Sequence, residues 1–588
     1  MRLEDQIAAL ESAGLVDLAA FQPELEYIFR HALIQEAAYE SLLRQDRRRI
    51  HRTVGLALEQ IYPAQREDLA PLLAHHFLEA GDDERALHYF TLAGDTAMQR
   101  YACPEAIAHY TQALQVARRV PLSGDQLIHL YLQSGRALEL TARYEEALRA
   151  YEELEVYGRE HGDRSLELAA LVARATIYST PTADYDRELG LALSEQALAL
   201  ANDVGDIQAR ARILWNLMRL HFGIAMDKAV EYGKESLALA RELNSRDQLA
   251  FTLNDLALCY IGSDQLEEAR KTLEEAGRLW RDLDRLPMQA DNLSSLTIVH
   301  ILSGEYEEAL ATSAEARRIS ESIDNLWGQA YSRTYIGLVY LEYGELSRAI
   351  QTMEESVELA EQAGFIIPLI ETRSILGLVY GMLGEIRRGI GLAQQALARA
   401  EEQLQPLRYS PLAILARLSI QAGLLEEAEA TISKCRALEW QNGFLLMPVW
   451  VMLAEGELAL ARQQYQRAIN IADELLNLLN KRTCLPLMPD ALMLKAQALF
   501  ADGQVEQAAE PAGEARRLAE RLRSRRSLWP ALALLADIEE RRGNHDQAAA
   551  LRRQARTIVE SIAETIAAPE LRAGFLNTPA VRALLERH

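Results

Sequence analysis

The sequence predicts an all-α fold, a right-handed superhelical solenoid of helix pairs that repeat about every 40 residues. Two patterns along the chain and its composition predict this fold. A four-residue turn motif recurs at a nearly constant spacing, and a small residue stands nine positions before almost every copy. Alanine, leucine, glutamate and arginine dominate, while glycine (31) and proline (17) are sparse among the 588 residues. Such a composition is typical of a chain of helices.

The turn motif consists of a usually apolar or aromatic residue, two mostly polar residues and an alanine. It reads YEEA at 144–147 and at 306–309, and LEEA at 266–269 and at 425–428. The first positions of the twelve copies are 103, 144, 185, 226, 266, 306, 346, 386, 425, 465, 505 and 545. Successive copies are 39 to 41 residues apart over eleven steps, which is the signature of stacked repeats.

A second periodic position along the chain supports the repeat that the turn motif indicates. The residue nine positions before the motif is small in eleven of the twelve units, and Leu217 is the exception. A small residue there lets the first helix of a pair approach the second closely. Glycine stands two positions before six of the motifs, as at Gly304 and Gly344, where it suits the left-handed conformation that ends a helix. Each unit is therefore predicted to be a first helix, a short turn and a second helix that starts at the motif.

These positions resemble the tetratricopeptide repeat, which places a small residue in the first helix and an alanine early in the second, as in GLVYLEYGELSRA at 337–349. Units of that family have 34 residues. The longer units of this chain resemble the arms of bacterial signalling ATPases of the STAND class. The resemblance implies entry helices at 61–120 and tandem repeats at 121–567. Residues 568–588 resemble the closing segment of such arms and are expected to cap the last repeat.

The first 60 residues differ from the repeats. An amphipathic helix is expected at 3–16, followed by two strand-like runs near 15–20 and 25–30. A helix followed by a hairpin resembles the end of a winged-helix domain. The block resembles the junction between winged helix and repeat arm in AAA/STAND ATPases, which occur with class III adenylate or guanylate cyclase domains and in LuxR-type regulators. The resemblance implies that residues 1–60 are a winged-helix remnant with junction helices.

His31, within FRHAL, is the residue of this block with a specific implied role. In several STAND ATPases a winged-helix histidine touches the bound nucleotide and helps to hold the off state. The resemblance therefore implies nucleotide sensing by His31. The alternative is a histidine that closes a helix start or a hairpin edge.

Catalytic motifs are missing from the sequence. No GxxxxGK[ST] phosphate loop occurs, and YGKES at 232–236 lacks both the upstream glycine and a Ser or Thr directly after the lysine. Neither HExxH nor GxSxG occurs, and no cyclase segment is found. We therefore predict that the chain is not an enzyme and has no catalytic residue, metal site or cofactor. A longer parent protein with ATPase or nucleotide cyclase activity is compatible with the resemblance.

The net charge, the cysteines and the apolar stretches indicate which partners and which compartment to expect. The formal charge of −24 repels phosphate backbones, so binding of nucleic acid is not expected. The basic runs at 47–52 and 521–526 are interpreted as solvated helix faces. The four cysteines form no CxxC pair, which fits a reducing cytoplasm. The longest apolar stretch is too short to cross a bilayer, so a membrane partner is not expected.

In tetratricopeptide arrays the first helix of each pair lines the concave face, at positions 15, 12 and 8 before the turn motif. This lining lacks the repeated Lys and Asn of a clamp for chaperone-tail carboxylates. Its acids Asp291, Glu371 and Asp490 favour a basic partner, and ordinary solvation of an exposed helix face is the alternative. The predicted groove residues are Asn254, Asp291, Ser294, Tyr331, Thr334, Glu371, Ser374, Trp450 and Asp490.

The repeats and the resemblance together favour a non-catalytic regulatory arm. It would bind a protein or peptide, or a small effector, and relay that event to an associated signalling ATPase, cyclase or transcription module. The alternative is a free-standing scaffold or adaptor that gathers partners in its groove. DNA binding through the winged-helix remnant is disfavoured by the negative charge.

Overall fold

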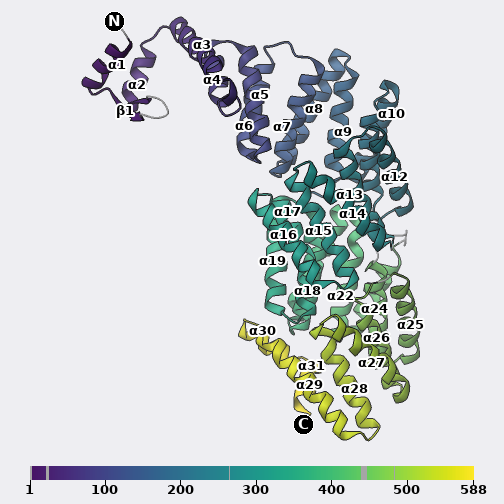
Figure 1. The fold of residues 1–588 in the computed structure, drawn as a ribbon. Helices are drawn as coiled ribbons and strands as arrows, with labels where there is room; N and C mark the ends of the chain where they lie inside the picture. Colours follow the sequence, from purple (N-terminus) through teal and green to yellow (C-terminus); the bar gives the residue numbers. More distant parts are fainter. Residues whose placement is uncertain (1–2, 21–25, 264, 439–445, 483, 588) are drawn as a thin grey trace. The chain divides into compact units, whose positions relative to one another are not determined.

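The computed structural model describes residues 3–20, 26–263, 265–438, 446–482 and 484–587. The chain divides into two compact units, Met1–Leu138 and Glu139–His588. Nearly all of the described residues lie in α-helices that follow one another as pairs (Figure 1). The predicted all-α repeat fold is confirmed.

The first unit begins with helix α1, continues with a small hairpin and is otherwise built of helices. Strands β1 and β2 pair antiparallel from Val16 opposite Phe29 to Ala20 opposite Glu26. The predicted N-terminal helix and hairpin are therefore present. The helices after the hairpin bury a core that includes Phe77. The elements of this unit are α1 (Leu3–Ser12), β1 (Val16–Ala20), β2 (Glu26–Phe29), α2 (Ala32–Glu40), α3 (Arg44–Ile61), η1 (Pro63–Gln65), α4 (Ala70–Ala80), α5 (Asp83–Gln99), α6 (Cys103–Ala117) and α7 (Gly124–Leu140), whose last two residues belong to the second unit.

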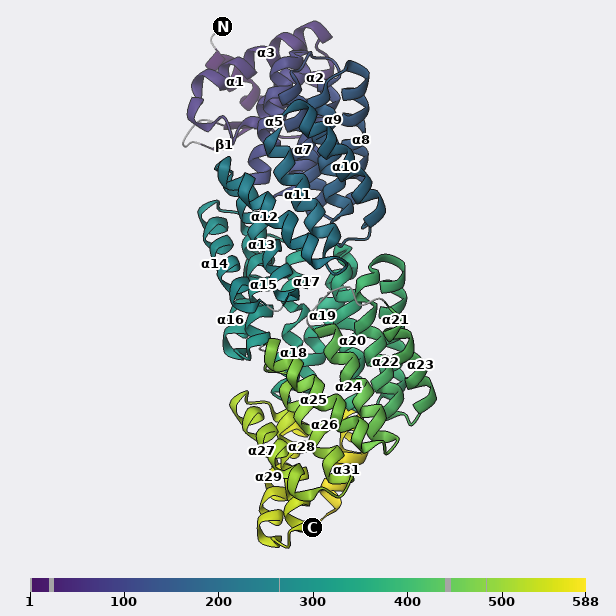
Figure 2. The same ribbon diagram turned by 90° about the vertical axis from the view of Figure 1, so that its right-hand side faces the viewer.

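The second unit is a succession of helix pairs, and Figure 2 shows its helices from α12 to α16 following one another. Its elements are α8 (Tyr144–His161), α9 (Arg164–Tyr178), α10 (Arg187–Val204), α11 (Ile207–His221), α12 (Met226–Glu242), α13 (Arg246–Gly262), α14 (Leu266–Asp282), α15 (Leu286–Ser303), α16 (Tyr306–Ser322), α17 (Leu326–Thr334), α18 (Ile336–Glu342), α19 (Leu346–Ala363), α20 (Ile366–Met382), α21 (Ile386–Gln403), η2 (Gln405–Arg408), α22 (Tyr409–Gln421), α23 (Leu425–Arg436), α24 (Leu446–Ala461), α25 (Tyr465–Arg482), α26 (Met488–Ala501), α27 (Val505–Arg521), α28 (Arg525–Arg541), α29 (His545–Glu564), α30 (Pro569–Leu576) and α31 (Pro579–Glu586).

The turn motif marks where the second helix of a pair begins. Eleven of the twelve motif positions are the first residue of a helix, from Cys103 in α6 to His545 in α29. The exception is the motif at 185, where α10 begins two residues later, at Arg187. In nine units the residue two positions before the motif takes the left-handed conformation, with φ +74° at Gly304 and +57° at Ala142. The 40-residue register is confirmed down to the start of individual helices.

The small-residue register brings paired helices into close contact. A Cβ on Gly377 in α20 would lie 2.7 Å from the carbonyl oxygen of Gly389 in α21. A Cβ on Gly94 in α5 would lie 2.5 Å from the ring of Tyr110 in α6. Real Cβ atoms do not approach neighbours this closely, so these positions require glycine.

The second unit also folds back on itself. The backbone N–H of Leu485 donates to the carbonyl of Leu302 at 3.3 Å, and Thr565 Oγ1 donates to the carbonyl of Gly344 at 2.8 Å. One hydrophobic cluster joins α13–α15 to α24–α26, and another joins α18–α22 to α28–α31. Helices about five repeats apart in sequence therefore pack against each other.

Two predictions from the sequence concern membrane-spanning helices and the state of the cysteines. Within the described residues, no helix is both long and apolar enough to cross a membrane. All four cysteines are buried, and none forms a disulfide within the described residues. Burial raises the pKa of the Cys259 thiol, which keeps it protonated and unreactive.

Candidate binding face of the second unit

One register position of several first helices carries polar and aromatic side chains that retain some solvent access. We call these residues the inner row; they stand fifteen positions before the turn motif, and each is half-buried. Its polar members bond to a first helix of a neighbouring repeat, as in the 3.1 Å contact between Tyr331 Oη and Ser295 Oγ. The row therefore links the repeats as well as facing solvent. The inner row consists of Asp291, Tyr331, Glu371, Trp450 and Asp490.

Asp291 lies on α15 in a polar but poorly solvated environment. The Nδ2 of Asn254 donates to its Oδ2 at 2.8 Å, and the Oδ1 of Asn254 accepts from Asn292 Nδ2 at 3.0 Å. Burial raises the pKa of Asp291 to about 7, and the nearby Asp255 adds to the shift. Near neutral pH this carboxyl is therefore shared between its protonated and ionised forms.

Glu371 lies on α20, and only one of its two carboxyl oxygens has a hydrogen-bond partner among the described residues. Ser410 Oγ donates to its Oε2 at 2.9 Å, whereas its Oε1 is buried with no hydrogen-bond partner in the part of the chain that the structure describes. Burial raises the pKa of Glu371 to about 7, and the Ser410 hydroxyl opposes that shift. A buried acceptor without a donor costs free energy, so the ionised form of Glu371 is disfavoured in the folded chain.

The predicted groove residues twelve positions before the motif lie deeper. Ser294, Thr334 and Ser374 are buried, and each hydroxyl donates to the carbonyl four residues earlier in its own helix, at 2.6 to 3.0 Å. Asn254 is also buried and bonds to Asp291. These four side chains lie within the helix packing, and only Asn254 acts on the inner row. A role for any of them in binding stays a prediction.

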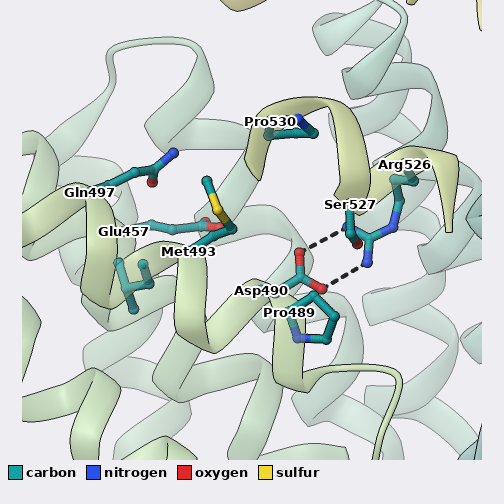
Figure 3. Close-up of a pocket in the computed structure, with 9 residues that line it drawn as sticks. Glu457, Pro489, Asp490, Met493, Gln497, Arg526, Ser527 and Pro530 are labelled. Atoms are coloured by element: carbon teal, nitrogen blue, oxygen red, sulfur yellow. Dashed lines mark hydrogen bonds and ion pairs between the residues drawn. The ribbon is translucent and has the colours of Figure 1, made fainter. Parts of the chain in front are cut away.

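A cavity of about 170 Å³ opens beside the last member of the row (Figure 3). We call it the ion-pair cavity, and it lies between α24, α26 and α28. Its rim includes the exposed Gln497, while Pro489, Met493 and Leu494 are buried in its wall. The residues that line it are Glu457, Pro489, Asp490, Met493, Leu494, Gln497, Arg526, Ser527 and Pro530.

Two arginines hold the acids at this cavity. The Nη1 and Nη2 of Arg526 donate to Asp490 at 2.8 and 2.7 Å (Figure 3), and its Nε donates to Glu342 at 2.8 Å. Arg417 binds Glu457 with both Nε and Nη2, at 2.7 to 3.2 Å. Burial alone would raise the pKa of Asp490, but the Arg526 guanidinium overrides it and lowers that pKa. Burial raises the pKa of Glu342.

The placement of Arg526 corrects the sequence interpretation. The basic run 521–526 was expected to lie on a solvated helix face, yet its last residue has a side chain only 16% exposed and pairs with Asp490 and Glu342. The available signal was opposite charge about one repeat apart. Arg417 and Glu457 both stand eight positions before a turn motif, and they pair across that 40-residue interval.

His31 belongs to the first unit, whereas the inner row and the ion-pair cavity belong to the second. It precedes α2 as its N-cap residue, is exposed, and makes no side-chain capping hydrogen bond. Its implied contact with a nucleotide stays a prediction. Among the described residues, no group of three or more His, Cys, Asp or Glu side chains is arranged to hold a metal ion.

No model of a known protein family matches the sequence, and no curated protein matches it either. Solved structures that it resembles are helical repeat proteins of the tetratricopeptide type. NprR in complex with its cognate peptide NprX has a TM-score of 0.44 at 16% identity, covering 61% of this chain and 100% of that one. Rap protein complexed with competence and sporulation factor has a TM-score of 0.40 at 14% identity, covering 68% and 98%. Yeast Tom70 has a TM-score of 0.32 at 13% identity, covering 85% and 96%. At these TM-scores, the ligand of this chain must be inferred from its own residues.

Proposed function

We propose that this chain is a non-catalytic regulatory arm that binds a peptide or protein segment along the inner row. The observation that supports it most is the inner row itself, in which half-buried polar and aromatic side chains recur at one register position of several first helices. A peptide supplies donors at regular intervals, from its backbone N–H groups and from polar side chains. Repeat proteins use their extended faces for such ligands because each repeat adds one set of contacts.

We further propose that the arm communicates the binding of this segment to an associated signalling ATPase, cyclase or transcription module. The support is the resemblance of the hairpin block at residues 1–60 to the junction of such machines. A relay requires that the ligand favour one of two conformations of the arm. In this proposal, a ligand on the inner row would favour one arrangement of the contacts between distant repeats in the second unit over another.

Peptide display on the full chain tests the binding role. We expect selected peptides to lose affinity by about tenfold or more when Tyr331→Ala removes an inner-row ring, because hot-spot aromatics dominate such interfaces. Tyr157→Ala removes a ring that is 41% exposed on α8 and is the matched control. Glu371→Gln keeps the shape of its side chain and tests the same face without opening a hole. An absence of enriched peptides, or equal losses in inner-row and control variants, would contradict the proposal.

Co-purification from the native cell separates the relay from a general scaffold. Recovery of one ATPase, cyclase or transcription subunit in constant proportion supports the relay. A varied set of partners that all compete for the inner row supports the free-standing scaffold or adaptor instead.

A further inference from the structure

The ion-pair cavity has the size and walls of a site for one side chain. Its volume of about 170 Å³ is below that of a typical small-molecule pocket, which is roughly 300–1,000 Å³. The rings of Pro489 and Pro530 and the side chain of Met493 supply apolar surface along it (Figure 3). Leu494 also lines it. Such walls suit an alkyl stem, and the acids Glu457 and Asp490 also line the cavity.

Ser527 gives the cavity an unused polar group. It is 5% exposed and lines the cavity, and its Oγ has no hydrogen-bond partner in the described ranges of the chain. The first turn of α28 does not need this hydroxyl, because Ser524 Oγ already accepts the N–H of Ser527 at 3.1 Å. A buried hydroxyl normally has a partner, so its position here indicates that a donor or acceptor enters the cavity from outside.

The surrounding charges select the sign of the ligand. Glu342, Asp490 and Glu457 carry three negative charges when ionised, and Arg417 and Arg526 carry two positive ones. The network has an excess of one negative charge where Glu342 is ionised, and burial raises the pKa of that carboxyl. An anion entering the cavity meets this excess, whereas a single cation neutralises it in a site of low dielectric.

The geometry of the ion pairs selects the kind of cation. The carboxylates of Asp490 and Glu457 are each engaged by a two-nitrogen fork, from Arg526 and Arg417 respectively. A second guanidinium would need a free carboxylate edge for its own fork. An ammonium is a point charge with three donors and can use the remaining lone pairs of these oxygens together with Ser527 Oγ.

We propose that the ion-pair cavity binds a primary ammonium group on an alkyl chain, namely a lysine side chain of the segment held by the inner row. The inference rests on the proposed peptide-binding function and names the side chain that it recognises at this site. Asp490 belongs to both the inner row and the cavity lining, so a peptide along the row passes the cavity entrance.

Methyl NMR of the full chain, with labelled methionine methyl groups, tests the cavity directly. The methyl group of Met493 lies in the cavity wall and is assigned by comparison with Met493→Leu. We expect n-butylammonium to shift this resonance saturably, n-butylguanidinium to bind more weakly, and butanol and butyrate to leave it unchanged. Equal shifts with butanol, a preference for butyrate, or no saturable shift with any probe would overturn the proposal.

Two variants identify the groups involved. Ser527→Ala removes a hydroxyl that has no partner among the described residues, so the fold should persist. The affinity for n-butylammonium should fall about tenfold, because one hydrogen bond to the ligand is lost. Glu457→Gln removes one negative charge from the lining and should weaken binding at least as much. Glu506→Gln on α27, whose side chain is 77% exposed, is the control and should have no effect. Unchanged affinity in Ser527→Ala and Glu457→Gln would contradict the assignment.

Display-selected peptides keep this inference separate from the proposed function. Replacement of each lysine in such a peptide by norleucine should weaken its binding at one position only. Peptides that bind the inner row with no lysine requirement leave the proposed function standing and overturn the cavity assignment. Ammonium binding without any selectable peptide would overturn the proposed function alone.

Discussion

At the scale of single residues, the inner row contains acids that the fold holds in poorly solvated positions. Asp291 accepts a hydrogen bond from Asn254 and Glu371 accepts one from Ser410, and burial raises the pKa of both acids to about 7. Asp490, which occupies the same register position, is paired with Arg526 and has a lowered pKa. One helical position therefore carries carboxyls with opposite pKa shifts, and the presence of an arginine partner makes the difference.

The raised pKa of Glu371 predicts a specific dependence of stability on pH. The folded chain holds this proton up to about pH 7, whereas the unfolded chain releases it near 4.5, so stability falls as pH rises through that window. Glu371→Gln cannot ionise, so we expect it to be more stable than the wild type at about pH 8, by roughly 1–3 kcal/mol, and similar to it below the unfolded pKa. Thermal unfolding of both proteins across pH measures the difference. Glu358→Gln, at an exposed position on α19, should follow the wild-type curve. Parallel curves for Glu371→Gln and the wild type would contradict the raised pKa.

Backbone strain at Ala142 gives a second prediction at this scale. Ala142 has φ +57°, two positions before a turn motif, where several other repeats have glycine. A left-handed conformation costs an L-residue about 1–2 kcal/mol, and glycine avoids most of that cost at some expense in chain entropy. We expect Ala142→Gly to stabilise the chain by up to about 1 kcal/mol, measured as a higher urea midpoint. A lower midpoint would show that the Ala142 methyl group contributes more through packing than it costs in strain.

At the scale of helices, the distance between paired helices depends on glycine at the small-residue register. Gly377 in α20 faces the backbone of Gly389 in α21, and a Cβ there would meet the Gly389 carbonyl oxygen at 2.7 Å. Backbone cannot move aside as a long side chain can, so the added methyl group must separate the two helices.

Paired alanine substitutions test this contact. We expect Gly377→Ala to destabilise the chain by about 1–3 kcal/mol through overpacking. Gly391 lies on α21, and a Cβ added to it would meet no described atom within 4 Å, so Gly391→Ala should stabilise by up to about 1 kcal/mol through helix propensity. Urea unfolding of both variants measures the two effects. Equal changes in the two variants would contradict a contact specific to Gly377.

The sequence predicts the helices well because their signals are local. The alanine and acids of the turn motif and the left-handed residue before it lie within a few residues of the helix start that they mark. The inner row follows from the same count, since Asp291, Glu371 and Asp490 share one register position. The count does not predict the burial of Ser294, Thr334 and Ser374, because burial depends on which helices pack around them.

At the scale of the whole second unit, contacts between distant repeats complete the site. Glu342, at the end of α18, accepts hydrogen bonds from Ser524 and Arg526 at the start of α28. These residues are more than 180 apart in sequence, and no local pattern relates them. The sequence therefore could not predict that Glu342 pairs with Arg526, nor that the cavity is built from a network reaching back to α18.

Removal of the buried link from α18 to α28 should loosen these contacts more than removal of the exposed one. Glu342 is buried against Arg526, and loss of one partner of a buried ion pair costs about 3–5 kcal/mol because the other charge is left uncompensated. Glu307 and Arg523 pair across α16 and the segment before α28, but both side chains are about 70% exposed, and such pairs contribute about 0–1 kcal/mol. We expect Glu342→Gln to lower the melting temperature and to speed amide hydrogen exchange in both α18 and α28, whereas Glu307→Gln changes neither.

Because Arg526 also holds Asp490, Glu342→Gln should weaken n-butylammonium binding at the cavity as well. Normal exchange in α18 and α28 in the Glu342→Gln variant would contradict the role of this ion pair in joining distant repeats.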